Sequence, residues 1–419
     1  MSASTYKKQF SNVDRNILSL LDFCKGLAMI WIFLFHYQRD WFGWQGVHIF
    51  ILLSGFGLTY SCLSKNKISW KHWYVRRAEK ILPTYWLVAL SGFLLMICMV
   101  IIKSYDEPLN DIIKSIIRLI LDIFLLRNLS YQTIFNYPFV TILPNDPLWF
   151  VPLIFGFYVI FPWLYTLIRK YRTAIGCLSI LLGAMAIEFI YRAISIYFLD
   201  GFPIGYENSL IGNLSVLALN PLDRLPDSFT MPFQLQAPFG LFPSRIAEFV
   251  LGMLAAVALV ENEQNFNNTF VNYRMGITGV FIWLAGYALV FVGLWGWIFG
   301  DFVISLGLVL WLVNLAWLCQ QILPFLFLKV SKLGSWSYYI FLTHVLILHL
   351  LEDIAAKLVT DNILPRSSLL KIAILGFMII GTWVASWLLM KFDKSKFPQI
   401  ITQQTIARFL QPERNSRIT

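Results

Sequence analysis

The sequence predicts an all-α, polytopic membrane protein of about ten transmembrane helices, with both termini in the cytoplasm. Its 419 residues are 58% hydrophobic and only 13% charged, whereas soluble domains are about one-quarter charged. Long apolar runs alternate with short polar stretches, and a helix needs about 20 mostly apolar residues to cross a bilayer. Lysine and arginine gather in every second connection, which is typical of cytoplasmic loops.

The predicted spans follow the apolar runs along the chain. They are 17–37, 46–63, 81–102, 148–168, 174–198, 241–260, 275–298, 301–321, 335–351 and 370–390. Residues 1–16 are expected to form a cytoplasmic N-terminal segment, 17–390 one transmembrane domain, and 391–419 a basic cytoplasmic tail. We find no internal repeat and no separate soluble domain.

The distribution of basic residues sets the predicted orientation. If the N terminus lies inside, the cytoplasmic connections collect most of the lysines and arginines, including the cluster from Lys65 to Lys80 and the group at 169–172. The formal charge of +10 is then a topology signal rather than a sign of nucleic-acid binding. Two long outer connections follow, at about 103–147 and 199–240.

The stretch DIIKSIIRLILDIF, residues 111–124, is apolar in parts but shorter than a membrane-spanning helix. Lys114, Arg118 and Asp122 are spaced four residues apart, so they would share one stripe of a helix. This pattern favours an amphipathic helix lying at the outer membrane interface.

The first span, which contains KGLAMIWIFLFHY, carries two polar residues in an apolar setting. Lys25 and His36 are eleven residues apart, which is about three helical turns, so both would lie on one helix face roughly 16–17 Å apart. A charged group inside a span costs a few kcal/mol and is a functional candidate. His36 can accept a proton at neutral pH, which suits a general base. Asp22 could orient Lys25 or pair with it.

Other polar groups within the predicted spans could have structural or functional roles. Glu188 and Arg192 are four residues apart and are expected to neutralise each other. Arg245 and Glu248 could form a similar pair or bind an acceptor. His344 is expected to be a packing histidine that hydrogen-bonds a neighbouring helix, with catalysis as the alternative.

The basic stretch WYVRRAEKILPTYW contains Arg76, Arg77 and Lys80. Together with Lys25 it could bind phosphates that enter from the cytoplasm. The alternative is a topological anchor that holds anionic lipid headgroups. No Walker motif, zinc-protease motif or Cys/His metal spacing is present, and no metal is expected.

These motifs, in their order, resemble the acyltransferase type 3 family of membrane-bound, acyl-CoA-dependent transferases. The resemblance covers roughly residues 15–390. It rests on LLDFCKGLAMIWIFLFH, GVHIFILLSGFGL, WYVRRAEKILPTYW, PLWFVPLIFGFYVIFPWL, SRIAEFVLGML and LGSWSYYIFLTHV. The chain departs from the family pattern at Lys25 and Lys80, where arginine is usual, and at His48 and Ile154, where an acid is common.

The resemblance implies transfer of an acyl group, most often acetyl, from cytoplasmic acyl-CoA to a hydroxyl of an exported or surface polysaccharide or a glycolipid. His36 and Asp22 would be the catalytic residues, with His36 as the general base or transient acyl acceptor. Lys25, Arg76, Arg77 and Lys80 would bind the donor. Acyl-CoA is then a co-substrate, membrane lipids and a glycan acceptor are the partners, and the location is the inner cell membrane. Outer-loop aromatic residues are expected to stack on the acceptor. The alternative class is a secondary transporter or flippase without transfer chemistry.

Overall fold

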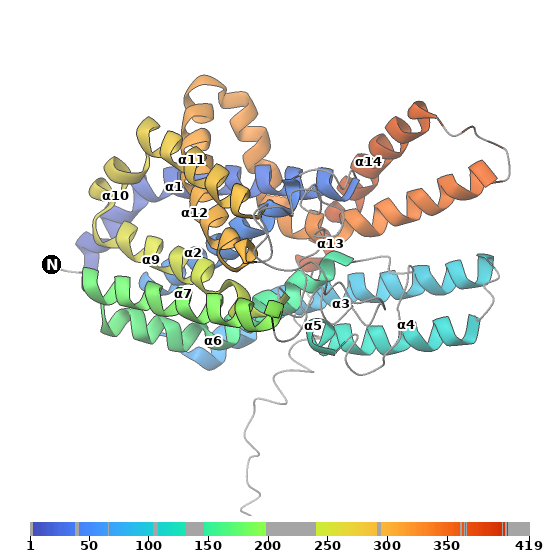
Figure 1. The fold of residues 1–419 in the computed structure, drawn as a ribbon, viewed down its shortest axis with the longest axis horizontal. Helices are drawn as coiled ribbons and strands as arrows, with labels where there is room; N and C mark the ends of the chain where they lie inside the picture. Colours follow the sequence, from blue (N-terminus) through green and yellow to red (C-terminus); the bar gives the residue numbers. More distant parts are fainter. Residues whose placement is uncertain are drawn as a thin grey trace, which may run out of the picture. The chain divides into compact units, whose positions relative to one another are not determined.

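The computed structural model describes residues 3–37, 42–65, 67–103, 108–130, 146–197, 240–290, 295–360 and most of 363–400. Within these ranges every regular element is a helix (Figure 1). The chain forms two compact units. The first consists of Met1–Ser64, Asn128–Pro138 and Leu153–Tyr338; the second consists of Lys65–Arg127, Phe139–Pro152 and Tyr339–Thr419.

Ten helices in the described ranges are long and apolar enough to cross a membrane, which confirms the predicted fold class. They are α1 (Ala3–Tyr37), α2 (Gly46–Leu63), α3 (Trp70–Lys103), α6 (Phe150–Lys170), α7 (Ala174–Tyr197), α9 (Ile246–Glu261), α11 (Tyr273–Val290), α12 (Gly296–Ile322), α13 (Pro324–Thr360) and α14 (Ser368–Asp393). The orientation of the termini stays a prediction. Helix α1 already begins within the polar N-terminal segment, which therefore continues the first span as helix.

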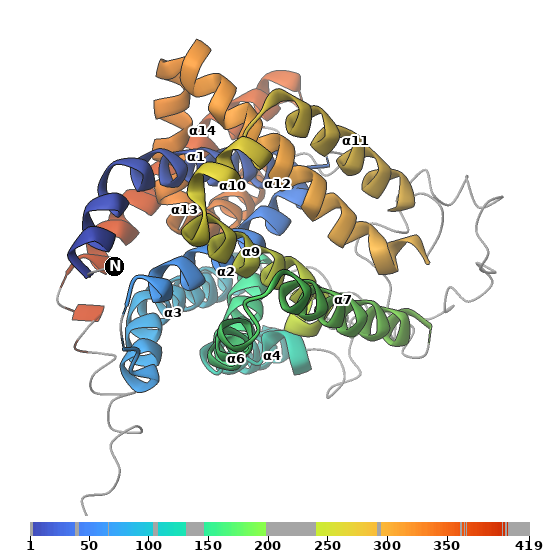
Figure 2. The same cartoon turned by 90° about the vertical axis from the view of Figure 1, so that its left-hand side faces the viewer.

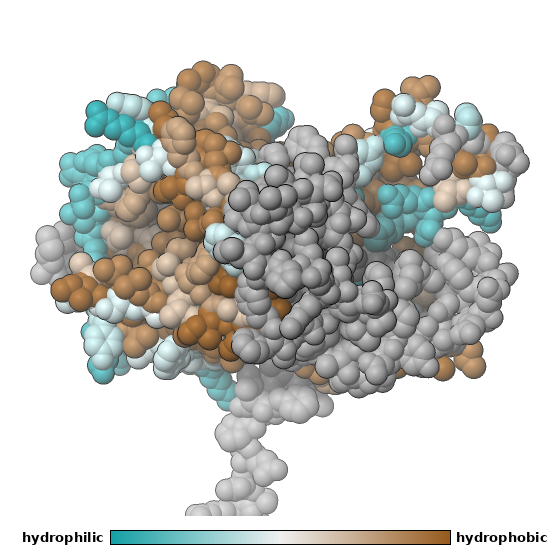
Figure 3. Space-filling model, in the orientation of Figure 1, coloured by the Kyte–Doolittle hydropathy of each residue, from teal (hydrophilic) through white to brown (hydrophobic). Residues whose placement is uncertain are grey.

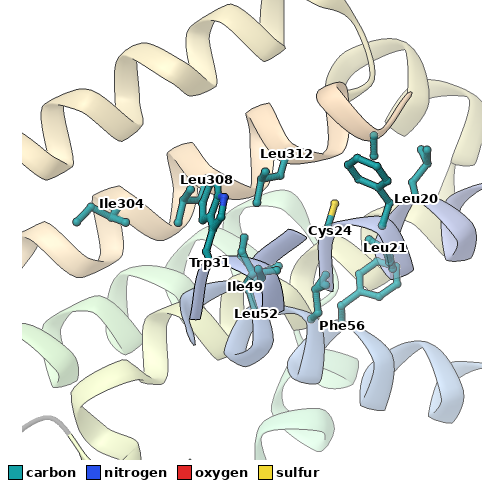
Figure 4. Packing of buried hydrophobic residues seen from close by; sticks show 14 of the residues in the cluster. Leu20, Leu21, Cys24, Trp31, Ile49, Leu52, Phe56, Ile304, Leu308 and Leu312 are labelled. Atoms are coloured by element: carbon teal, nitrogen blue, oxygen red, sulfur yellow. The ribbon is translucent and has the colours of Figure 1, made fainter. Parts of the chain in front are cut away.

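The core of the first unit is built by α1, α2, α9 and α12. Helices α2 and α9 approach closely, because a Cβ at Gly55 would collide with the backbone oxygen of Phe249, and one at Gly252 with that of Leu52. Around this contact lies one cluster of buried apolar side chains (Figure 4). Its members include Leu20, Leu21, Cys24 and Trp31 from α1, Ile49, Leu52 and Phe56 from α2, and Ile304, Leu308 and Leu312 from α12.

Helix α7 shows how the apolar surface of the first unit is arranged. Its outward side chains include Ile175, Leu182 and Ile190, which are about half to four-fifths exposed, and apolar residues cover this part of the surface (Figure 3). Glu188 and Arg192 on the same helix are fully buried. The helix therefore presents an apolar face outward, as a lipid-facing span requires, and turns its charged residues into the protein.

The boundary between α11 and α12 differs from the sequence prediction. The two helices lie side by side (Figure 2), and α12 begins at Gly296 rather than at 301. The earlier start places Asp301 inside the helix, where it is 1% exposed. The predicted span 301–321 begins at this residue, which is not among the candidates predicted from sequence.

In the second unit, α4 (Pro108–Ile123) confirms a helix in the 111–124 region but corrects its predicted orientation. Trp86 Nε1 donates to the Ile123 carbonyl at 3.0 Å, and Ser115 Oγ lies 3.2 Å from Met96 Sδ. Since the order of the contacts is reversed between the two helices, α4 runs antiparallel along α3. A helix lying flat at the interface would cross α3 instead.

The two faces of α4 explain this packing. Asp122 is 4% exposed and contacts Tyr85 of α3 at 3.5 Å and Arg127 of α5 (Arg127–Ser130) at 3.3 Å. The exposed residues of α4 are apolar, among them Ile113, Ile116 and Ile120. Asp122, one residue of the polar stripe, therefore has its partners within the protein and not in interfacial water. The predicted outer connection 199–240 lies almost entirely outside the described residues.

Candidate functional site

Helix α1 carries Asp22, Lys25 and His36 without interruption, as predicted. Lys25 Nζ lies 3.1 Å from Asp22 Oδ1, and the two side chains are 34% and 39% exposed. The ammonium group therefore has a carboxylate partner and also remains accessible. Of the two predicted roles for Asp22, the structure contains the pairing with Lys25.

The ring of His36 is held by its own helix. His36 Nδ1 lies 2.8 Å from the carbonyl oxygen of Ile32, and the Phe35 ring packs edge-on against the imidazole. Because a carbonyl oxygen can only accept, this contact requires the proton on Nδ1. The neutral ring then has its lone pair on Nε2. This tautomer is the one that can take up a proton at Nε2.

The other predicted donor-binding residues lie on the first turns of α3, in the second unit. Arg76 and Lys80 are exposed. Arg77 is half-buried, with its guanidinium carbon 5.6 Å from the centre of the Trp73 ring. The three cations thus share one helical segment, while Lys25 and His36 belong to the first unit.

A buried charged network occupies the first unit and includes residues that sequence reasoning treated separately. His48 Nδ1 of α2 lies 3.0 and 3.1 Å from the two carboxylate oxygens of Glu248 in α9. Arg245, in the short helix η6 (Phe242–Arg245), donates to Glu248 at 3.3 Å and lies 3.3 Å from Asp301 of α12. The structure therefore favours the structural role predicted for Arg245 and Glu248.

Arg192 of α7 is the centre of the network's other half. Its guanidinium donates to Asp301 Oδ2 at 2.6 Å and to the backbone oxygens of Ser244 and Trp297, each at 2.7 Å. Its predicted partner Glu188 is 3.7 Å away. Arg192 therefore links α7 to η6 and α12, and its main ionic partner is Asp301.

Glu188 has a second role at the start of α9. Its Oε2 accepts a hydrogen bond from the backbone N–H of Ala247 at 2.9 Å. Ala247 lies in the first turn of α9, whose N–H groups have no partner within the helix and attract negative charge. The predicted self-contained Glu188–Arg192 pair is thus only one contact within a larger network.

The charges of this network nearly balance. Among the described residues it contains two guanidinium groups, from Arg192 and Arg245, and three carboxylates, from Glu188, Glu248 and Asp301. His48 Nε2 and Asp301 Oδ1 each lack a hydrogen bond and lie 3.7 Å apart. A proton on both ring nitrogens of His48 would balance the charges. Arg245 Nη1, also 3.0 Å from Nδ1, has the two neighbouring carboxylates as acceptors.

His344 lies in the part of α13 that belongs to the second unit and is fully buried. Its Nδ1 is 3.0 Å from the carbonyl oxygens of both Ile340 and Phe341, so the ring bonds to its own helix. The neighbouring Thr343 hydroxyl contacts Ser386 of α14 at 3.0 Å. The burial of His344 fits a packing role, but its Nδ1 contacts lie within α13 and not on a neighbouring helix as predicted. No group of three or more His, Cys, Asp or Glu side chains in the described ranges could hold a metal ion.

Comparison with known proteins gives one match. The sequence profile of the acyltransferase 3 family, described as an acyltransferase domain, matches residues 18–391. No curated protein and no solved structure matches the chain. Since the profile extends from the first span into the last, the chain belongs to the acyltransferase 3 family and is a multi-pass membrane acyltransferase.

Proposed function

We propose that the protein transfers an acyl group, with acetyl as the preferred group, from cytoplasmic acyl-CoA to a hydroxyl of a surface polysaccharide or glycolipid in the cell membrane. The observation that carries this proposal is the hydrogen bond from His36 Nδ1 to the Ile32 carbonyl. It fixes an imidazole on α1 in the tautomer with a basic Nε2, on the same helix as the accessible cation Lys25.

His36 would act as the general base. Its Nε2 takes the proton of the acceptor hydroxyl while the hydroxyl oxygen bonds to the thioester carbonyl carbon. The carbon–sulfur bond then breaks, and the CoA sulfur leaves with the proton returned by His36. In the alternative route Nε2 attacks the thioester itself and carries the acyl group to the acceptor. Trapping of an acyl-imidazole after acid quenching would distinguish the two routes.

In the first unit, donor binding is assigned to Lys25. In the second unit, Arg76, Arg77 and Lys80 are assigned as phosphate-binding residues. The phosphates of CoA suit guanidinium and ammonium groups. Lys25 lies roughly 16–17 Å from His36 along α1, which is comparable to the reach of the extended pantetheine arm. Because Lys25 is already paired with Asp22, a donor phosphate would compete with that carboxylate.

The test is CoA release and transfer of label from radiolabelled acetyl-CoA, measured on the purified protein and on His36→Gln. We expect kcat to fall by about 10²–10⁴-fold, as is typical for loss of a general base, with little change in the KM of acetyl-CoA. His349→Gln, on α13, is the matched control and should retain activity. Unchanged kcat in His36→Gln would refute the role of His36, whereas no CoA release by the wild type with any acyl-CoA would refute the proposed function.

A further inference from the structure

Two indole rings stack where the starts of α2 and α12 meet. Trp44 lies in the short helix η1 (Phe42–Gln45) and Trp297 in the first turn of α12, with ring centres 5.8 Å apart and planes at 26°. Trp44 is half-buried and Trp297 is 7% exposed. The pair thus reaches from the interior of the first unit towards its surface.

The buried network contacts the backbone of Trp297 and the ring of Trp44. Arg192 donates to the carbonyl oxygen of Trp297 at 2.7 Å. On the other side, the Trp44 ring meets the His48 ring edge-on at 5.7 Å, and Glu248 holds His48. Because both supports are buried and ionic, the two indoles are preorganised by the scaffold.

Beside these rings lie buried hydrogen-bond donors without acceptors. The Gln45 side-chain oxygen accepts from Trp283 Nε1 at 2.6 Å, which fixes the amide so that its NH₂ is the unpaired end. Trp297 Nε1 and Trp295 Nε1 are also buried without a hydrogen bond. An indole N–H can only donate. A buried donor without a partner destabilises the fold, and the acceptor oxygens of a ligand could satisfy these groups.

The indole pair is close to the end of α1 that carries His36. A Cβ at Gly43, the residue before Trp44, would collide with the Trp31 carbonyl oxygen and would also contact Phe35. Phe35 directly precedes His36. The turn that carries Trp44 and Gln45 is therefore packed against the last turns of α1.

We propose that Trp44, Gln45 and Trp297 form the subsite for the acceptor, and that it takes a neutral pyranose ring. Aromatic faces combined with neutral N–H donors suit a ring with apolar faces and hydroxyl oxygens. The nearby cations Arg192 and Arg245 are engaged by carboxylates, so the subsite offers no charge for the phosphates of CoA. This inference rests on the proposed function, and it moves the stacking residues from the outer loops to helix-borne positions.

The first test measures binding without chemistry. The protein is labelled with 5-fluorotryptophan, and the ¹⁹F signals of Trp44 and Trp297 are identified by their loss in Trp44→Phe and Trp297→Phe. A panel of methyl pyranosides with gluco, galacto, manno and rhamno configuration is then titrated. We expect at least one of them to shift both signals. The Trp86 signal, whose indole N–H already bonds to Ile123 at 3.0 Å, should stay unchanged.

The second test measures transfer. Trp297→Phe keeps an aromatic ring but removes the N–H, and it should raise the acceptor KM about fivefold, the effect of one hydrogen bond. Trp86→Phe is the matched control and should leave the acceptor KM unchanged.

The outcomes separate the subsite from the proposed function. If pyranosides shift both signals but no acyl-CoA releases CoA, the subsite stands and the transfer proposal fails. If no pyranoside moves either signal, or if glycerol at equal hydroxyl concentration shifts them as much, the subsite is refuted whatever the activity. An unchanged acceptor KM in Trp297→Phe also counts against it.

Discussion

Two sets of polar residues lie within the apolar helices of the first unit, and they differ in how much of their bonding capacity the fold uses. The α1 set consists of Asp22, Lys25 and His36. Its carboxylate–ammonium pair is more than one-third exposed, and the His36 Nδ1 contact is to its own helix. The buried network joins α2, α7, η6, α9 and α12, and its side chains are 0–8% exposed.

This difference indicates that the two sets have different roles. Removing one partner of a buried ion pair strongly destabilises the folded protein, whereas an exposed ion pair contributes about 0–1 kcal/mol to its stability. The network should therefore dominate stability, and the α1 set should dominate turnover. Equal losses of stability, or equal losses of turnover, from substitutions in the two sets would contradict this assignment.

The largest effect on stability is expected for Arg192→Ala. The change removes the guanidinium group that lies 2.6 Å from Asp301 and 3.7 Å from Glu188, and Asp301 keeps the longer contacts with Arg245 and His48. We expect a loss of about 3–5 kcal/mol in the free energy of unfolding. Denaturant unfolding in detergent measures this loss, and Arg192→Lys, which keeps the charge, should recover part of it.

The matched control for this prediction is Arg172→Ala. Arg172 pairs with Glu261 at 3.0 Å, but the side chains are 41% and 45% exposed. We expect this change to cost about 0–1 kcal/mol. Equal losses in the two variants would mean that burial does not distinguish the network from the surface.

A double-mutant cycle of His48→Gln and Glu248→Gln tests whether one contact of the buried network stabilises the fold. Each single change leaves a buried partner, so each should be destabilising, while the double change removes both partners together. We expect a coupling energy of about 1–3 kcal/mol between the two positions. Thermal or denaturant unfolding of the four proteins gives this value. Additivity within about 0.5 kcal/mol would show that the 3.0 Å contact does not stabilise the fold.

The α1 set could be predicted from sequence because its geometry is local. Lys25 and His36 lie on one helix, so their spacing follows from helical periodicity alone. The ten spans were predictable for a similar reason, since each has its own apolar run.

The network could not be predicted as a unit because its bonds join distant parts of the chain. Glu188 and Arg192 are neighbours on α7, yet the shortest ionic contact of Arg192 is with Asp301, 109 positions away. Asp301 is not predicted as a buried charge because the predicted span begins at this residue, whereas α12 begins five residues earlier. His48 was noted only as a departure from the family pattern. Its role depends on Glu248, 200 positions away.

The packing of α4 along α3 could not be predicted for the same reason. The spacing of Arg118 and Asp122 predicts a polar stripe but not what the stripe contacts. Only the contacts with α3 and α5 show that Tyr85 and Arg127 are partners of Asp122.

A smaller effect, which links stability to the α1 set, is expected for Gly334→Ala. A methyl group at Gly334 of α13 would collide with the Asp22 carbonyl oxygen of α1, so the two helices must move apart. We expect a loss of about 1–3 kcal/mol, together with a higher KM for acetyl-CoA because Lys25 is displaced.

Its control is Gly376→Ala on α14, where nothing lies within 4 Å of the added methyl group. Alanine favours a helix by up to about 1 kcal/mol over glycine, so this variant should be neutral or slightly more stable. Opposite signs for the two glycines in unfolding experiments would support the close α1–α13 contact. A stabilised Gly334→Ala variant would contradict it.

The smallest effect on stability is expected for Lys25→Gln, because an exposed pair contributes about 0–1 kcal/mol. Its effect on the KM of acetyl-CoA should be larger, a rise of about 3–10-fold from the loss of one phosphate contact. Asp22→Asn should act in the opposite direction, since it releases the Lys25 ammonium from the carboxylate 3.1 Å away. Steady-state kinetics on the two variants therefore decides what Asp22 does. A lower KM in Asp22→Asn means that it competes with the donor, and a higher one that it orients Lys25. If Lys25→Gln leaves the KM unchanged, this lysine is not part of the donor site, and the division between the two sets applies to His36 alone.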